Sequence, residues 1–440
     1  MPESNNRNAA VIATARFLGL KPGEFVAVSW SFIYFFSLLS AYYMLRSVRE
    51  AMAIMGGTQN IPWLFTGTFV VMMLATPVFG WVASRYPRKQ FLPWVYCFFV
   101  LNILIFFAAF TYALRNDVET VWIARAFFVW LSVFNLFVVS VFWSFMADIY
   151  SKDQGRRLFG LISAGGSAGA LIGPLMTSVL VVPLGFQNLL PLSAGLLMFS
   201  IYCVAQLRRW ADQAPSEGHQ VSLDASKPIG GGAMAGIRLV LTSPYLGAIA
   251  LSGALASLMG TATYIYMAQL VSENFATTDE QTRVFALLDA VTNALSLIGQ
   301  LIIVKQVVQR FGIGVSLSIL PIVSVIGFAI LAINPIFIVL ATLQVARRSL
   351  TFGLGKPTSD MLYTVVSPEE KYKAKNFTET ALYRGGDLVG AWAVKLMAGL
   401  GLSGISLACV PLAAAWTAIA FWLGKDYQRR DKAISEGQTV

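Results

Sequence analysis

Long apolar segments dominate this sequence, and they constrain its fold more than any other feature. Each has about 20 residues, the length that a helix needs to cross a bilayer. They lie near 25–45, 61–83, 92–114, 121–147, 158–182, 189–207, 244–271, 284–304, 313–333, 336–355, 377–398 and 404–423. Only 12% of the residues are charged, about half the share that is usual in soluble domains. The sequence therefore predicts an all-α membrane protein with twelve transmembrane helices, and not a soluble enzyme.

Basic residues fall mainly on one side of the predicted membrane. Of the 32 Lys and Arg, 23 lie in the termini and in the loops on the side of the N-terminus, whereas Arg115 and Arg283 lie on the other side. Because cytoplasmic loops are enriched in Lys and Arg, we expect both termini to be cytoplasmic and the protein to lie in the plasma membrane, the inner membrane in a bacterium. The basic residues behind the net charge of +10 lie mainly in these termini and loops, where they set the topology. We therefore expect the lipid bilayer as a partner and no nucleic acid.

A polar stretch divides the apolar segments into two sets of six. We expect a cytoplasmic N-terminal segment at 1–24, a six-helix bundle at 25–207, a cytoplasmic linker at 208–243, a second six-helix bundle at 244–424 and a cytoplasmic tail at 425–440. Similar residues recur in the two bundles, since Arg125 and Arg347 are 222 positions apart and Arg85 and Arg310 are 225 apart. This spacing indicates an internal repeat.

Two motifs accompany the repeat. The loop after the second apolar segment reads Gly80-Trp-Val-Ala-Ser84-Arg85-Tyr-Pro87-Arg88-Lys89, and the fifth segment contains Gly165, Gly169, Gly173 and Pro174. Both resemble motifs of the major facilitator superfamily, although Ser84 stands in place of an acid and Pro87 in place of a glycine. The resemblance implies a fold of two six-helix halves, with gating roles for Arg85, Arg88 and the glycine-proline motif. Glycines at every fourth position also suit close helix packing alone.

Charged residues within the apolar segments are costly and are functional candidates by default. The basic ones in or beside the segments are Arg46, Arg49, Arg125, Arg347, Arg348, Arg384 and Lys395, and the acidic ones are Glu50, Asp289, Glu379 and Asp387, a surplus of three positive charges. Helical spacing puts Tyr42, Arg46 and Arg49 on one face, and Asp289 and Asn293 on another. We expect these faces to line a cavity for an anionic solute. Ion pairs such as Arg46 with Glu50, or Arg384 with Asp387, could instead be purely structural.

Arg347 and Arg348 are consecutive, so on a helix they point roughly 100° apart, and we do not expect them to share one acidic partner. We expect one of them to face the cavity. The planar guanidinium group suits phosphate or carboxylate ligands.

Two stretches are similar to the ATP/ADP translocase family of nucleotide exchangers. One is Leu45-Arg46-Ser-Val-Arg49-Glu50, and the other runs from Lys356-Pro357-Thr358-Ser359-Asp360 to Lys371-Tyr-Lys373-Ala-Lys375. The resemblance implies antiport of a nucleotide, with Arg49, Glu50 and Asp289 near its path. The chain departs from the family at Asp387, where a lysine is usual, and at Ser359, which replaces another lysine.

Catalysis, metals and cofactors are not indicated. The pattern Gly165-Gly166-Ser167-Ala168-Gly169 lies in an apolar helical segment without a partner base, and the single histidine lies in the linker. The three cysteines lack metal-ligand spacing, and no phosphate-binding loop is present. We therefore expect a monomeric secondary transporter for a small anionic solute, most simply a nucleotide exchanger. The alternatives are a proton-coupled carrier or exporter of another small solute, and a receptor or scaffold without transport.

Overall fold

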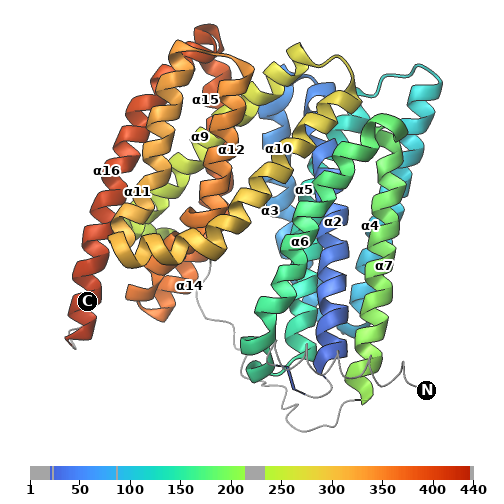
Figure 1. The fold of residues 1–440 in the computed structure, drawn as a ribbon, viewed down its shortest axis with the longest axis horizontal. Coiled ribbons are helices and arrows are strands. Elements are labelled where there is room, and N and C mark those ends of the chain that lie inside the picture. Colours follow the sequence, from blue (N-terminus) through green and yellow to red (C-terminus); the bar gives the residue numbers. More distant parts are fainter. Residues whose placement is uncertain (1–19, 22–23, 86–87, 214–232, 437–440) are drawn as a thin grey trace, which may run out of the picture.

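The computed structural model describes residues 20–21, 24–85, 88–213 and 233–436, and these are almost entirely helical. Figure 1 shows two helical bundles side by side. The first consists of α2 (Glu24–Met55), α3 (Ile61–Arg85), α4 (Arg88–Arg115), α5 (Val121–Ile149), α6 (Lys152–Leu184) and α7 (Phe186–Gln213). The second consists of α9 (Pro244–Asn274), α10 (Thr278–Ile298), α11 (Val304–Ile333), α12 (Phe337–Leu350), α15 (Tyr383–Leu396) and α16 (Gly401–Ser435), with the shorter α8 (Ala233–Thr242), α13 (Lys356–Met361) and α14 (Pro368–Phe377).

The helices match the twelve predicted spans. Among the described residues, ten helical segments are long and apolar enough to cross a membrane. One of them, Thr278–Ile333, covers both the eighth and the ninth predicted spans, and Gly312 with φ 76° separates two helices within it. The eleventh predicted span corresponds to α15, whose hydropathy is lowered by Arg384, Asp387 and Lys395. The prediction of an all-α membrane protein with twelve helices in two halves is confirmed.

Three segments of the second bundle are π-helical, so that each hydrogen bond spans five residues along the chain and not four as in an α-helix. They are Gly299–Ile303, Thr351–Gly355 and Thr378–Leu382. The first two pack directly on each other, because a Cβ added at Gly299 would lie 3.1 Å from the Cα of Gly353. Such segments occur often at functional sites, and here they follow or precede the helices that carry Asp289, Arg348 and Arg384.

The predicted glycine motif brings α6 against α2. A Cβ added at Gly165 or Gly169 would lie 2.4 Å from the carbonyl oxygen of Phe32 or Phe36, closer than side chains tolerate. At the start of α6, Ser151 and Gln154 form a capping box, and Arg157 binds Glu24 of α2 with a nitrogen-oxygen distance of 2.8 Å. The two helices are therefore held together along most of their length.

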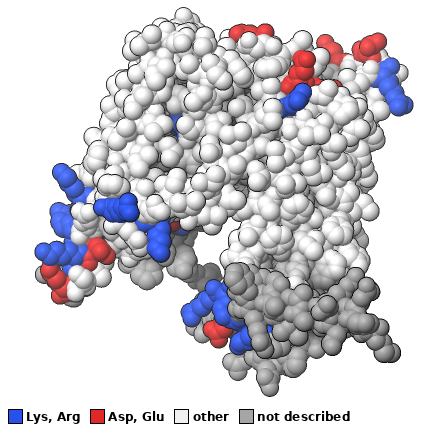
Figure 2. Space-filling model, viewed as in Figure 1, with Lys and Arg blue, Asp and Glu red and all other residues white. Residues whose placement is uncertain are grey.

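Both ends of the described chain lie on one side, which we call the terminal face (Figure 1). The bundles meet nearer the opposite face. There the backbone nitrogen of Phe186 donates to Asp279 at 2.7 Å, and Trp392 of α15 donates to Thr66 of α3 at 3.1 Å. Midway along α6, Asn293 of α10 donates to the carbonyl of Ala170 at 2.6 Å. Toward the terminal face the bundles separate, as Figures 1 and 2 show. The structure is thus closed at the opposite face and open at the terminal face.

Charge follows the same division. Figure 2 shows Lys and Arg gathered at the terminal face, with an almost uncharged band between the two faces on this side of the molecule. Part of the predicted organisation lies outside the described residues, namely 1–19 of the N-terminal segment and 214–232 of the linker. Arg85 ends α3 and Arg88 begins α4, but their side chains are not among those that the structure describes, so their gating role stays a prediction.

Candidate substrate site between the two halves

Charged residues of α2, α10 and α12 meet where the two bundles touch. The Oδ2 atom of Asp289 lies 3.6 Å from Nε of Arg46, and its Oδ1 atom lies 2.7 Å from Nη2 of Arg348. Arg46 is also 3.8 Å from Oε1 of Glu50, one helical turn further along α2. Since Arg46 and Asp289 belong to different bundles, this group of charges joins the two halves of the molecule.

Arg49 completes the group, which we call the central charge cluster: Arg46, Arg49, Glu50, Asp289 and Arg348. Nη1 of Arg49 lies 3.3 Å from Oε1 of Glu50, and its Nε atom donates to the carbonyl of Phe128. The guanidinium carbon lies 4.0 Å from the centre of the Phe128 ring, a distance at which a cation is attracted to the ring face. With three arginines and two carboxylates, the cluster has a surplus of one positive charge.

The carboxylates and the guanidinium groups of the cluster differ in exposure. The side chains of Glu50 and Asp289 are 8% and 3% exposed, whereas those of Arg46, Arg49 and Arg348 are 18%, 18% and 22% exposed. Within the described protein, Oε2 of Glu50 and Oδ2 of Asp289 are buried and form no hydrogen bond, whereas Nη2 of Arg348 is paired with Oδ1 of Asp289. The arginine side chains are therefore the more accessible members of the cluster.

Arg347 does not join the cluster. Its side chain is buried in the second bundle, where it donates to the hydroxyl of Ser324 at 3.0 Å, to the hydroxyl of Thr263 at 3.4 Å and to the carbonyl of Ala256 at 3.2 Å. These contacts tie α12 to α9 and α11. Of the two consecutive arginines, only Arg348 thus reaches the interface between the halves.

The remaining predicted residues lie around the cluster or apart from it. Tyr42 packs against Tyr43, whose ring lies 5.4 Å from the guanidinium carbon of Arg46, and against Phe134. Asn293 is used in the contact to Ala170. Asp387 accepts hydrogen bonds from Ser257 at 2.5 Å and from Thr261 at 3.2 Å, and it lies 3.7 Å from Arg384. Asp387 and Arg384 therefore form a separate charged pair within the second bundle.

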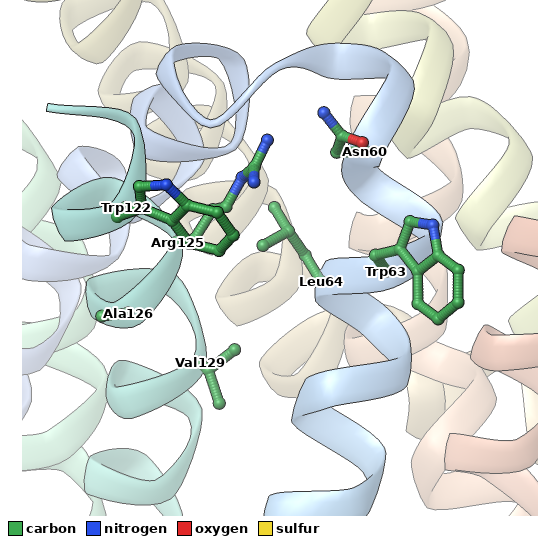
Figure 3. A pocket seen from close by; sticks show the side chains of 7 residues that line it. All are labelled: Asn60, Trp63, Leu64, Trp122, Arg125, Ala126 and Val129. Carbon is green, nitrogen blue, oxygen red and sulfur yellow. The ribbon is translucent and has the colours of Figure 1, made fainter. Parts of the chain in front are cut away.

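Arg125 makes none of the contacts of the central charge cluster. Its Nε atom donates to the carbonyl of Gly56 at 3.0 Å, and its guanidinium carbon lies 4.6 Å from the ring of Trp122. It lines a cavity of about 520 Å³ between α3 and α5 near the opposite face (Figure 3).

The family model of the Major Facilitator Superfamily matches residues 25–376 of this chain. The chain belongs to the major facilitator superfamily. Members of this superfamily are integral membrane transporters rather than enzymes, so the coarse prediction of a transporter is confirmed. A comparison with curated proteins finds no match.

Solved structures of superfamily transporters share the fold. A bacterial homologue of the iron transporter ferroportin in an inward-facing state matches with a TM-score of 0.66 and 14% identity, over 91% of this chain and 98% of that chain. The nucleoside transporter NupG matches with a TM-score of 0.57 and 15% identity, over 92% and 98%. A bacterial homologue of the human lysosomal transporter Spinster, inward-facing and unoccupied, matches with a TM-score of 0.56 and 14% identity, over 93% and 98%. At these identities the likeness shows the fold alone.

In this member of the superfamily, sequence reasoning missed a second charged group at the terminal side of the second bundle. Lys375 lies 2.8 Å from Asp360 and 3.8 Å from Glu379, and Lys356 pairs with the same two acids. Burial, which lowers the pKa of Lys375, is outweighed by the two carboxylates, so this pKa is raised above its usual value. The i, i+4 spacing of Lys356 with Asp360, and of Lys375 with Glu379, was a usable signal.

No sequence pattern indicated the aromatic side chains beside the cluster, since Phe128 and Tyr43 are two among many aromatic residues in apolar segments. No group of three or more His, Cys, Asp or Glu that could hold a metal ion occurs in the described part of the chain.

Proposed function

We propose that this protein is a secondary transporter that carries an organic phosphate anion, most simply a nucleotide in exchange for another, by alternating access. The supporting observation is the central charge cluster, which is shared by both halves and has one positive charge in excess. A site at the interface of the repeats is the usual place for a transported solute in such folds. The planar fork of an arginine side chain can bind two oxygens of a phosphate or carboxylate group at once.

The cluster also suggests how binding drives movement. A phosphate group that enters from the terminal face competes with Asp289 and Glu50 for the arginine side chains. When Arg46 turns from Asp289 to the phosphate, one electrostatic contact between the halves is lost, and the closed side can open. Without an anion, the ion pair between Arg46 and Asp289 holds the halves together. An empty carrier that stays closed in this way exchanges solutes and does not leak them.

The nucleotide part of the proposal rests on the translocase-like segments and on the surroundings of the cluster. The ring of Tyr43, which is partly exposed, lies beside Arg46, so apolar surface for a planar base adjoins donors for phosphate. Two lysines of the second translocase-like segment, Lys356 and Lys375, pair with Asp360 and Glu379 at the terminal side.

The test is exchange in liposomes that contain the purified full-length protein. Liposomes are loaded with unlabelled ADP and offered labelled ATP, and parallel sets use GTP, glycerol 3-phosphate and glucose. We expect uptake of a phosphate compound that depends on an internal counter-solute. Absence of uptake above protein-free liposomes across the whole panel contradicts the proposal. Binding without uptake favours the receptor alternative.

A proton-coupled carrier is the second candidate, and Asp387 is the observation that favours it. This carboxylate lies within the second bundle and is held mainly by the hydroxyls of Ser257 and Thr261, with Arg384 at 3.7 Å. Uptake driven by an imposed pH gradient, and abolished in Asp387→Asn, supports coupling to protons. Exchange that ignores the gradient and survives Asp387→Asn supports the leading proposal.

Placement in the membrane is part of the proposal. The excess of basic residues at the terminal face supports a cytoplasmic location of both termini, in the inner membrane for a bacterial protein, and the molecule is expected to act as a monomer. Reporter fusions after Ser435 and after Arg115 test the topology. A cytoplasmic signal from the second fusion contradicts it.

A further inference from the structure

A groove between the first turns of α3 and α5 opens at the surface of the first bundle (Figure 3). Trp63 and Leu64 form one wall, and Trp122, Ala126 and Val129 form the other. Figure 3 shows the two indole rings on opposite sides, with Arg125 between them. The cavity of about 520 Å³ is large enough for part of a lipid molecule, and its walls are almost entirely apolar.

Among the described residues that line this groove, Arg125 is the one cation. Its Nε atom is engaged by the carbonyl of Gly56, and one face of its guanidinium group lies against Trp122. Within the described part of the chain, no acidic side chain forms an ion pair with it. Its remaining N–H groups can therefore bind an external anion, and the site combines one positive charge with an apolar channel.

The groove lies at the depth of a bilayer interface. Trp63 is in the first turn of α3 and Trp122 is in the first turn of α5, and they are 58% and 71% exposed. Tryptophan is enriched at this level of membranes. Further along α3, Leu74 and Val78 are 66% and 58% exposed, so an apolar face continues from the groove toward the middle of the membrane.

We propose that this groove is a binding site for a phospholipid of the leaflet at the opposite face. The phosphate binds Arg125 between the two tryptophans, and an acyl chain lies along Leu64, Val129 and the exposed side of α3. The groove adjoins the contact between Trp63 and Trp392, so the bound lipid covers one edge of the closed interface between the halves. The site is separate from the proposed transport site and does not depend on the transported solute.

The test is native mass spectrometry of the full-length protein in detergent after delipidation. The probes are palmitoyl-oleoyl phosphatidylglycerol, the corresponding diacylglycerol without phosphate, and soluble glycerol 3-phosphate. We expect one phospholipid to be bound at least about tenfold more tightly by the wild type and by Arg125→Lys than by Arg125→Gln, because hydrogen bonds to a charged group are lost. Diacylglycerol should not distinguish the variants.

Two further variants keep the proposal testable if Arg125→Gln folds poorly. Val129→Trp keeps the cation but fills the groove, so phospholipid binding should fall while glycerol 3-phosphate is unaffected. Arg115→Gln, an exposed arginine at the same face, should bind lipid as the wild type does. The proposal is overturned if Arg125→Gln and Val129→Trp both retain the lipid, or if Arg125→Gln weakens the binding of glycerol 3-phosphate as much as that of phospholipid. It is also overturned if the wild-type protein carries a second copy of the chain and no lipid, and Arg125→Gln loses that copy.

Discussion

The carboxylate of Asp289 lies 3.6 Å from the guanidinium group of Arg46, and this ion pair connects the two halves of the protein. The same carboxylate binds Arg348 of its own half. One acid thus serves two bases that belong to different bundles. A change in Asp289 or in Arg46 therefore alters both the charge of the proposed substrate site and the attachment of the two halves.

Replacement of Asp289 should convert exchange into leak. In Asp289→Asn, Arg46 loses the carboxylate that holds the empty carrier closed, so the carrier can change state without a solute. We expect efflux of labelled nucleotide into solute-free buffer to rise about tenfold, which corresponds to about 1.4 kcal/mol. Glu119→Gln, an exposed acid in the loop before α5, is the control. Efflux that stays at the wild-type level contradicts the role of the ion pair.

The consecutive arginines of α12 should behave differently when they are replaced. Arg348→Gln removes a donor from the proposed site, and we expect nucleotide binding to weaken about 10-fold to 100-fold, since a hydrogen bond to a charged group contributes about 1.5–3 kcal/mol. Arg347→Met should instead lower the thermal unfolding temperature, because Ser324 and Ala256 lose their buried partner. Binding is measured on folded protein. Loss of binding in a stable Arg347→Met protein would reverse this assignment.

Close packing between α2 and α6 should make Gly169 intolerant of a side chain. A Cβ there would lie 2.4 Å from the carbonyl oxygen of Phe36, so Gly169→Ala should destabilise the fold by about 1–3 kcal/mol, as overpacking does. Gly160→Ala on the same helix is the matched control, because its Cβ would contact nothing within 4 Å. The readout is the thermal unfolding temperature.

Exchange by the folded fraction of the Gly169→Ala protein separates the two interpretations of the glycine motif. A rate equal to the wild type supports packing alone, and a slower rate supports a gating contribution. Equal stability of the two alanine variants would contradict the close approach itself.

The hydrogen bond between Trp392 and Thr66 should favour the state that is closed at the opposite face. Thr66→Val removes the acceptor, and a loss of about 1 kcal/mol should shift the two states by about fivefold. Distances between spin labels at Arg156→Cys and Lys432→Cys, in a chain without its native cysteines, report the separation at the terminal face. We expect a larger population of short distances. Thr76→Val, which loses only a bond within α3, should leave the distribution unchanged.

Hydropathy predicted the helices well. A segment that crosses the membrane must form its backbone hydrogen bonds within itself, so a long apolar segment in the sequence directly indicates a helix. The predicted end of the first span was wrong. The prediction stopped at residue 45, whereas α2 continues to Met55. Arg46, Arg49 and Glu50 do not end the helix, because their charges are paired inside the protein instead of meeting lipid.

The arrangement across the two halves was harder to predict. Helical spacing indicated the pairing of Arg46 with Glu50, but the contact of Arg46 with Asp289 depends on how α2 and α10 cross. Likewise, the consecutive arginines were expected to point in different directions, yet the choice between them is set by the rotation of α12. The π-helical segments that adjoin these residues have no sequence pattern that distinguishes them from α-helix.

The hydrogen bond from Asn293 to Ala170 lies near the middle of α6 and is a pivot point for a rotation of this helix. From Ala170, the helix extends about 27 Å to its start near the terminal face and about 21 Å to its other end, at about 1.5 Å per residue. A rotation of about 10° at this point would move the start of α6 by about 5 Å. Since α2 is locked onto α6 by the glycine motif, Arg46 would turn with it. A small rearrangement around one bound anion would therefore produce a large displacement of α2 and α6 at the terminal face.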